Sequence, residues 1–281
     1  MSVISGTTTK TLPNLEAISK ISDNDLIYVE LAQGGSRKMT YADLLSNISI
    51  GGAMAREQQC INGSRAKGIE WDVDELMTLV RNGDFDKFAI GDYITDSETS
   101  IEFAIAAKNF YPVQAFNQSR PEFNHIVLMP FTALATKHPF NHNYNTNSGG
   151  YAGSDMSSVL EMEIQKLSLK IRNYCTLPQT LENNKGAWDT DHGGHSMRLP
   201  TVMEVTGDRG WASTEGFSSG VSGQLPLCKS TWFRVLKDDW YWLLDPSSFD
   251  TTDFCNISSN GSSNHTSATT VGSIRPLLVM I

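Results

Sequence analysis

The residue string most typical of a catalytic or metal site is Asp-Thr-Asp-His-Gly-Gly-His, at positions 189–195. Carboxylates and imidazoles are common ligands of transition metals, and a bound metal could assist a hydrolytic reaction. The spacing does not match the helical HExxH motif, and the glycines favour a flexible loop. Two interpretations stay open: a solvated loop, or a metal-assisted hydrolase that uses Asp189, Asp191, His192 and His195.

Other catalytic patterns give less support for an enzyme. Gly149–Ser154 is glycine-rich and precedes a predicted helix, but it lacks the Gly-Lys-Ser/Thr ending of a P-loop. No GxSxG nucleophile motif occurs. The four cysteines, at positions 60, 175, 228 and 255, form no CxxC pair and predict buried thiols rather than disulfides. We therefore expect a protein that is not an enzyme and that has no catalytic residue, cofactor or bound metal.

The net charge of the chain bears on whether its partner could be a nucleic acid. Its 281 residues include 22 Lys and Arg against 31 Asp and Glu, a net charge of −9. Binding to nucleic acid through the phosphates needs a basic surface, so we do not expect it. No apolar run approaches the length of a membrane helix, and the first residues do not resemble a signal peptide. We expect synthesis in the cytoplasm and no membrane insertion.

Aromatic residues gather near the C-terminus, in Trp240-Tyr241-Trp242. In a strand, alternate side chains point to opposite faces, which places Trp240 and Trp242 on one face and Tyr241 on the other. Trp242 leads into two leucines and is predicted to lie in the core. Either Trp240 or Tyr241 could then be exposed at a binding rim, because an amphipathic ring supplies contact area at low entropic cost.

The elements that would position these residues follow from periodicity and capping. Asp72 with Glu75 predicts a helix start and Gly83 a helix end, and Thr201 with Glu204 predicts a second capped helix. The spacing of apolar residues predicts a long helix over Ser154–Tyr174. Strands are predicted at 85–95, 100–111, 123–131, 232–237, 240–244, 253–257 and 274–281, and loops at 141–150 and 258–270. This pattern predicts an α+β domain that is closed by its C-terminal strands.

The first fifty residues differ from the rest. A strand is predicted at Leu26–Leu31, followed by a short helix at Tyr41–Asn47 that Thr40 and Asp43 would cap. A unit of this size buries little surface and needs a partner to be stable. We therefore expect a module at 1–50, a linker at 51–70 and a larger domain at 71–281.

The larger domain resembles proteins with a C-type-lectin-like fold. The resemblance rests on Trp240–Ser248, Phe254–Gly261, Val271–Leu278 and an earlier Leu-Pro-Thr-x-x-Glu-Val segment at Leu199–Val205. Formylglycine-generating-enzyme-like domains and the variable proteins of diversity-generating retroelements share this fold. The sugar-binding signatures of calcium lectins and the paired catalytic cysteines of formylglycine-generating enzymes are absent, so the resemblance does not imply either activity.

The N-terminal module is similar to the first segments of phage tail fibres. The similarity lies in Leu12–Leu15, Asp25–Val29 and Thr40–Leu45. It implies attachment to other tail proteins of the virion and a homotrimer. The expected architecture is therefore a C-type-lectin-like domain preceded by a small tail-fibre attachment module.

Together the two resemblances imply a phage or prophage receptor-binding protein located in the virion tail. Its polar C-terminal loops would contact a glycan or a protein on the host surface. The candidate ligand-binding residues are Trp240, Tyr241, Asp245, Ser247, Asp250, Asn256, Asn260, Asn264 and His265. A glycan-degrading or metal-assisted hydrolase and a purely structural virion or adhesin component remain alternatives. The abundance of Asn, Ser, Thr and Asp in these loops also suggests diversification by a retroelement.

Overall fold

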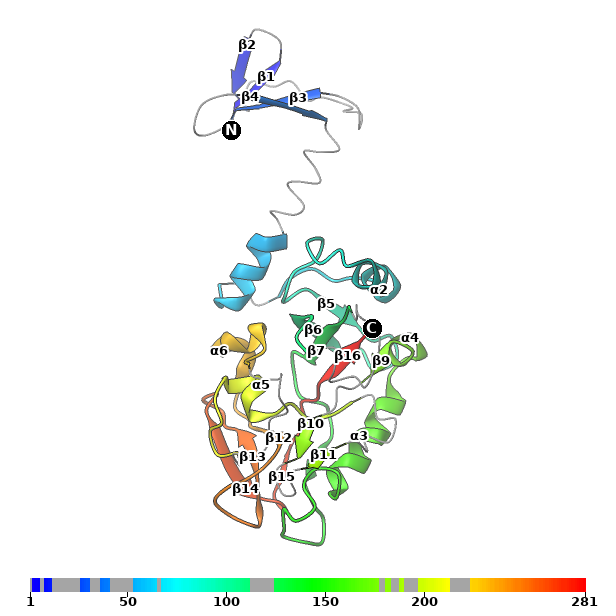
Figure 1. Ribbon diagram of the computed structural model, residues 1–281, viewed down its shortest axis with the longest axis vertical. Coiled ribbons are helices and arrows are strands. Elements are labelled where there is room, and N and C mark those ends of the chain that lie inside the picture. The colour runs from blue at the N-terminus through cyan, green and yellow to red at the C-terminus, as the bar shows by residue number, and fades with distance from the viewer. Residues whose placement is uncertain are drawn as a thin grey trace. The chain divides into compact units, whose positions relative to one another are not determined.

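The structure is a computed structural model that describes most of the chain, in two compact units, Met1–Ala55 and Arg56–Ile281 (Figure 1). The described residues are 2–5, 8–11, 26–30, 36–40, 53–64, 67–111, 124–176, 180–182, 187–189, 197–212 and 223–281. Residues 53–61, within the stretch predicted as a linker, are helical.

The first unit contains a four-stranded antiparallel sheet in the order β2-β1-β3-β4. Its strands are β1 (Ser2–Ser5), β2 (Thr8–Thr11), β3 (Leu26–Glu30) and β4 (Ser36–Thr40). The strand predicted at Leu26–Leu31 is confirmed as β3. The helix predicted at Tyr41–Asn47, with its Asp43 cap, lies outside the described residues.

The second unit is built on two five-stranded sheets and confirms the α+β class. One sheet has the order β5-β6-β7-β16-β9 and the other β14-β13-β12-β15-β8. The strands of the first sheet are β5 (Tyr93–Thr95), β6 (Glu102–Lys108), β7 (Ile126–Pro130), β16 (Leu278–Met280) and β9 (Cys175–Thr176). Those of the second are β14 (Ser263–Ser267), β13 (Asp253–Ile257), β12 (Tyr241–Pro246), β15 (Val271–Ser273) and β8 (Lys137–Pro139). Strands β10 (Thr180–Glu182) and β11 (Ala187–Asp189) form a separate antiparallel pair.

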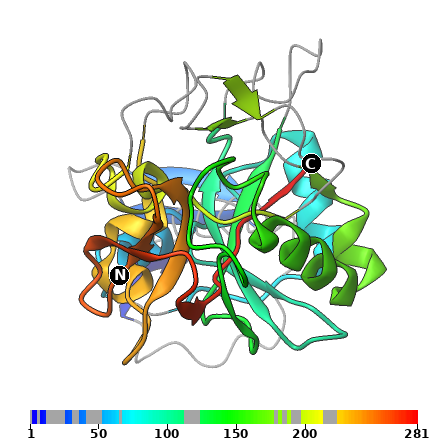
Figure 2. The ribbon, with the colours of Figure 1, turned by 90° about the horizontal axis from the view of Figure 1, so that it is seen from below.

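Helices pack beside these sheets, and the β13–β14 hairpin of the second sheet lies beside the first. Figure 2 shows α3 on one side of the sheet that contains β6, β7 and β16, and the hairpin on the other side. The helices of the second unit are α2 (Val73–Asn82), α3 (Asp155–Lys166), α4 (Leu169–Arg172), α5 (Val202–Thr206) and α6 (Thr231–Arg234), with a 3-10 turn, η3, at Pro226–Lys229. Strand β16 lies between β7 and β9, so the C-terminal segment closes the sheet as predicted.

Successive side chains of β12 point to opposite faces of its sheet and belong to two different hydrophobic clusters. Trp242 and Leu244 belong to one cluster, and Tyr241 and Leu243 belong to the other. Trp242 is fully buried, which confirms its predicted place in the core. Because both faces of β12 are covered, Tyr241 is equally buried and does not reach a binding rim.

Local capping chemistry gave accurate helix boundaries. The Asp72 side chain accepts hydrogen bonds from the Asp74 and Glu75 main-chain N–H groups, and Gly83 ends α2 with a φ of 78°. Thr201 and Glu204 form the predicted capping box of α5. The long helix predicted over Ser154–Tyr174 is instead two helices.

The break between α3 and α4 has a tertiary cause. Leu167 adopts an extended conformation with ψ 154°, and Ser168 caps α4 by accepting from the Ile171 N–H. The main-chain N–H of Ser168 donates to the buried Asp96 carboxylate at 2.8 Å. This distant carboxylate fixes Ser168 outside the helix, and the apolar periodicity alone does not reveal it.

Several strand predictions were wrong. Residues 85–92 form turns and an isolated bridge between Ile90 and Asp92, where the Asp92 carboxylate accepts from the Ala89 N–H, and only β5 remains of the strand predicted at 85–95. Of residues 232–237, the first three belong to α6, where Trp232 and Phe233 both pack on Phe131. Of residues 274–281, only 278–280 pair as a strand. Strand β14 lies inside the loop predicted at 258–270, because main-chain pairing with β13 needs no apolar side chains.

All four cysteines carry thiols rather than disulfide bonds, as predicted. Cys60, Cys228 and Cys255 are buried, whereas Cys175 is half-buried. Burial raises the pKa of the Cys228 thiol to about 12, so this thiol stays protonated near neutral pH.

Candidate ligand-binding surface

Three aromatic side chains gather on the surface of the second unit: Trp211, Phe249 and His265, here called the aromatic tip. The ring centroids of Trp211 and Phe249 lie 4.9 Å apart at 68°, and those of Trp211 and His265 lie 4.7 Å apart. Phe249 is 71% exposed and Trp211 is 37% exposed. Exposed aromatic rings in mutual contact are typical of a site that binds a ligand.

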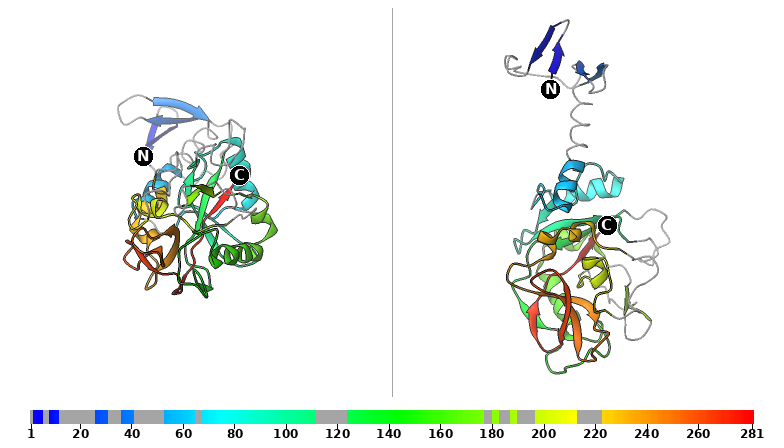
Figure 3. Two further views of the ribbon diagram at one scale, coloured as in Figure 1. Left: turned by 60° about the horizontal axis from the view of Figure 1, so that its bottom comes forward. Right: turned by 90° about the vertical axis from the view of Figure 1, so that its left-hand side faces the viewer.

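Three separate segments supply these rings. Trp211 follows α5, Phe249 lies in the β12–β13 loop, and His265 lies in β14. In the right-hand view of Figure 3, the β13–β14 hairpin, drawn in orange to red, forms the lower part of the second unit. The aromatic tip is therefore a product of tertiary structure.

Hydrogen bonds hold the Trp211 side chain and backbone in place. The indole Nε1–H donates to the Ser263 main-chain oxygen at 3.1 Å. The Ser248 N–H donates to the Trp211 oxygen at 3.0 Å, beside a β-bridge between Ala212 and Ser247. These contacts join the segment after α5 to the β12–β13 loop, so the rings are preorganised before any ligand arrives.

Two carboxylates lie beside the rings. His265 Nδ1 is 2.7 Å from Asp253 Oδ2, which favours the tautomer with a proton on Nδ1. The exposed Asp250 carboxylate accepts from the Thr252 hydroxyl at 2.6 Å and from its N–H at 2.9 Å. These bonds, with His265 as a smaller contributor, lower the pKa of Asp250. Asp250 therefore carries a negative charge at neutral pH.

A buried amide supports the loop that carries Phe249 and Asp250. Asn147 Nδ2 donates to the Asp250 oxygen at 2.7 Å and to the Asp253 oxygen at 3.0 Å, and the Asn147 N–H donates to the Thr251 oxygen at 2.8 Å. The predicted loop at 141–150, which contains Asn147, is therefore packed against the aromatic tip's own loop.

A buried polar network lies beneath the same segments. The Val202 N–H at the start of α5 donates to Asp245 Oδ2 at 2.6 Å, and burial raises the pKa of Asp245 to about 7. Arg198 and Glu204 form a fully buried ion pair at 2.6 Å, which the Tyr111 hydroxyl joins. Burial opposes the charge of Glu204, but Arg198 together with hydrogen bonds from the Tyr111 hydroxyl and the Thr201 N–H outweighs burial and lowers the Glu204 pKa. The network ties α5 to β12, the two elements that lead to Trp211 and Phe249.

The structure brings only part of the predicted site together. Asp250 is exposed beside Phe249, and His265 belongs to the aromatic tip. Trp240 is half-buried and packs edge-on against Trp242, with ring centroids 4.8 Å apart. Trp211 and Phe249 were missed because neither lies in an aromatic-rich string of the sequence.

Four residues that were predicted to contact a ligand are buried in the structure. Tyr241, Asp245, Ser247 and Asn256 are at most 6% exposed, so their side chains belong to the scaffold. Tyr241 and Asp245 lie in β12 and Asn256 lies in β13, strands whose side chains are buried on both faces, and Ser247 is covered where it bridges to Ala212.

Two further predicted residues, Asn260 and Asn264, are exposed but are separated from Phe249 or from His265 by their positions in the hairpin. Asn260 is in the β13–β14 turn, at the opposite end of the hairpin from the β12–β13 loop. Asn264 pairs with Asn256, and His265 pairs with Cys255, so strand alternation places Asn264 on the opposite face from His265.

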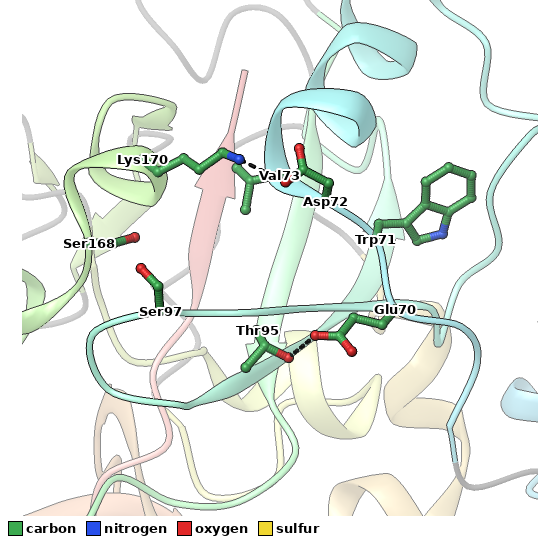
Figure 4. Close-up of a pocket in the computed structure, with 8 residues that line it drawn as sticks. All are labelled: Glu70, Trp71, Asp72, Val73, Thr95, Ser97, Ser168 and Lys170. Atoms are coloured by element: carbon green, nitrogen blue, oxygen red, sulfur yellow. Dashed lines mark hydrogen bonds and ion pairs between the residues drawn. The ribbon is translucent and has the colours of Figure 1, made fainter.

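A surface pocket of about 390 Å³ lies elsewhere in the second unit (Figure 4). Its charged groups are already paired: Lys170 Nζ lies 2.8 Å from Asp72 Oδ2, and the Thr95 hydroxyl donates to Glu70. The lining residues are Glu70, Trp71, Asp72, Val73, Thr95, Ser97, Ser168 and Lys170. The pocket lies where α2, α4 and β5 meet, and these contacts join the three elements.

The predicted metal-binding string falls largely outside the described residues. The backbone of Asp189 ends β11, while Asp191, His192 and His195 lie outside the described part of the chain. Within the described ranges, no group of three His, Cys, Asp or Glu side chains is placed to hold a metal ion.

Comparison with known proteins identified no relative of this chain. No family model, no curated protein and no solved structure matches the chain. Among the helices that the structure describes, none combines the length and the apolar character needed to span a bilayer.

Proposed function

We propose that this chain is a receptor-binding protein of a phage or prophage tail, and that its second unit is a C-type-lectin-like domain. In this proposal the N-terminal unit attaches the protein to other tail proteins as a homotrimer, as the resemblance to tail fibres implies. The second unit binds a ligand on the host surface. The protein acts by adhesion, without catalysis.

The observation that carries the proposal is the aromatic tip. Phe249 is a large apolar side chain that is 71% exposed, yet its loop is fixed by Asn147 and by the contact of Ser248 with Trp211. Exposure of such a ring has no benefit for folding, since burial would stabilise it by about 1.5–3 kcal/mol. A rigid, exposed aromatic anchor is characteristic of a binding surface.

The position of the last strand supports the lectin-like assignment. Strand β16 pairs antiparallel with β7, so the chain end returns to the centre of a sheet that begins at β5. The segments on which the resemblance rests, Leu199–Val205 and Trp240–Ser248, meet where Val202 contacts Asp245. The two segments also carry the chain toward Trp211 and Phe249.

Attachment to whole cells tests the proposal. The full chain, labelled with a fluorophore, is incubated with a panel of intact bacterial strains, and bound label is measured by flow cytometry. We expect saturable binding to a subset of strains, and at least a roughly tenfold loss of binding for Phe249→Ala. The control is Met162→Ala, since Met162 is 60% exposed on α3, a helix on the other side of the sheet from the β13–β14 hairpin (Figure 2).

Two outcomes would overturn the proposal. One is the absence of saturable binding to every strain in the panel. The other is undiminished binding by Phe249→Ala, which would remove the aromatic tip, the observation that carries the proposal. Binding by the Met162→Ala variant should equal that of the original protein.

A further inference from the structure

Lysine and arginine are absent from the stretch of sequence that supplies Phe249 and His265, and the basic residue nearest to the aromatic tip in the sequence is the exposed Arg209, two positions before Trp211. Of the five aspartates between Asp238 and Ile274, two lie at the aromatic tip, Asp250 and Asp253, while Asp245 is buried and Asp238 and Asp239 precede the far end of β12. Asp250 and Asp253 of this stretch flank Phe249 and His265, and the bonds from Thr252 lower the Asp250 pKa. The side of the aromatic tip formed by Phe249 and His265 therefore favours a positively charged ligand and disfavours an anionic one.

The aromatic rings favour the same charge. The face of an aromatic ring carries partial negative charge and attracts ammonium groups. Phe249 is exposed enough to offer one ring face, and Trp211 supports it edge-on, at an interplanar angle of 68°. Rings in direct contact leave no gap for a cation between them, so the ligand must lie on top of the exposed surface.

Short polar side chains lie in the loop that carries Phe249, where the Ser248 hydroxyl donates to the Trp211 oxygen and the Thr252 hydroxyl donates to Asp250, and their oxygens can still accept hydrogen bonds from a ligand. Ser248, Thr251 and Thr252 lie in the β12–β13 loop. Ser267, at the end of β14, donates to Asn145 Oδ1 at 2.6 Å, so the loop at 141–150 adds amides to the same end of the hairpin. Hydroxyl and amide groups around an aromatic face suit the many hydroxyls of a sugar better than the side chain of a lysine.

We propose that the aromatic tip binds a glycan that carries free amino groups, with a sugar ring stacked on Phe249 and an ammonium group paired with the Asp250 carboxylate. This inference rests on the proposed function and names the ligand class of the same surface. No metal ion takes part in the interaction.

Calorimetry with defined probes tests the ligand class. The full chain is titrated with a tetramer of β-1,4-linked glucosamine, with its fully N-acetylated counterpart and with tetralysine, at a pH below the pKa of the sugar amine. We expect the glucosamine tetramer to bind roughly tenfold more tightly than either of the other probes, because only it offers both a sugar ring and ammonium groups. Added EDTA should leave this affinity unchanged.

Matched variants separate charge from stacking. Asp250→Asn should abolish the preference for the free amine over the N-acetylated tetramer, whereas Phe249→Ala should weaken the binding of both sugars. The control for charge is Asp238→Asn, because Asp238 is exposed and lies before β12, at the opposite end of that strand from Asp250.

Several results would overturn this inference while leaving attachment to cells intact. Equal binding of the acetylated and free-amine tetramers would exclude the ammonium contact, and tighter binding of tetralysine would assign the surface to a peptide. No binding of any probe by a protein that still attaches to cells would exclude amino glycans. Failure of the original protein to attach to any cells, in contrast, would overturn the proposed function itself.

Discussion

The side-chain amide of Asn147 donates a 2.7 Å hydrogen bond to the main-chain oxygen of Asp250, joining two loops that are 103 residues apart in the sequence. The same amide contacts the oxygen of Asp253, at the start of β13. Asn147 is 5% exposed, so water does not replace these bonds easily. One buried side chain thus holds both Asp250 and Asp253, the residue at which β13 begins.

Replacement of Asn147 by aspartate should loosen this loop. Asn147→Asp keeps the shape of the side chain but removes both N–H donors and places a charge near carbonyl oxygens. We expect a loss of about 1–3 kcal/mol in the free energy of unfolding. Hydrogen exchange should increase for Ser247–Asp253 and remain unchanged in α2. Unchanged exchange in the loop would contradict the supporting role of Asn147.

The pKa of Asp245 predicts a pH dependence of stability. Burial raises this pKa from 3.8 to about 7, so between these values the folded protein binds a proton that the unfolded chain has released. The contribution of Asp245 therefore favours folding at acidic pH and is lost as the pH rises from about 4 to about 7. The full shift corresponds to about 4 kcal/mol as an upper bound.

Asp245→Asn isolates this contribution. Urea unfolding of the two proteins across this pH range should show the original protein losing stability relative to the variant, with a constant difference above about pH 7. Asparagine retains an oxygen that can accept from the Val202 N–H. A difference that does not vary with pH would show that Asp245 has an ordinary pKa.

The buried pair of Arg198 and Glu204 should be far more sensitive than an exposed pair. Glu204→Gln leaves the Arg198 guanidinium in a fully buried site with no carboxylate, which costs about 3–5 kcal/mol. The control is Glu163→Gln on α3, whose partner Lys166 is exposed, and there the expected loss is at most about 1 kcal/mol. Similar losses in both variants, measured by urea unfolding, would contradict this account.

Much of the helical structure could be predicted because helix ends depend on local chemistry. Asp72 and Gly83 mark the ends of α2 through bonds to residues within four positions, and Thr201 pairs with Glu204 in the same way. The break at Ser168 could not be predicted, because Asp96, 72 residues away, causes it. Strand β14 was missed for a related reason: its Ser, Asn, His and Thr side chains do not show that β13 pairs with it.

Only part of the candidate site could be predicted, because some of its contacts join residues that are far apart in the sequence. His265 and Asp250 were identified because polar residues in C-terminal loops are typical binding residues. Trp211 lies 38 positions before Phe249, and the two meet only because Ala212 bridges to Ser247. No spacing pattern within one element reports such a contact, so the aromatic tip emerges only from the folded chain.

The indole of Trp211 should contribute through its hydrogen bond as well as through its ring. Trp211→Phe keeps an aromatic ring but removes the Nε1–H that donates to the Ser263 oxygen, which should cost about 1 kcal/mol in the free energy of unfolding. Because the ring then loses its fixed orientation, attachment to cells should fall several-fold, with saturation reached at higher protein concentration. Ser263→Ala is the control, since the acceptor is a main-chain oxygen that this substitution retains. Equal effects of the two substitutions on attachment would show that the Ser263 side chain, rather than the indole hydrogen bond, determines the position of Trp211.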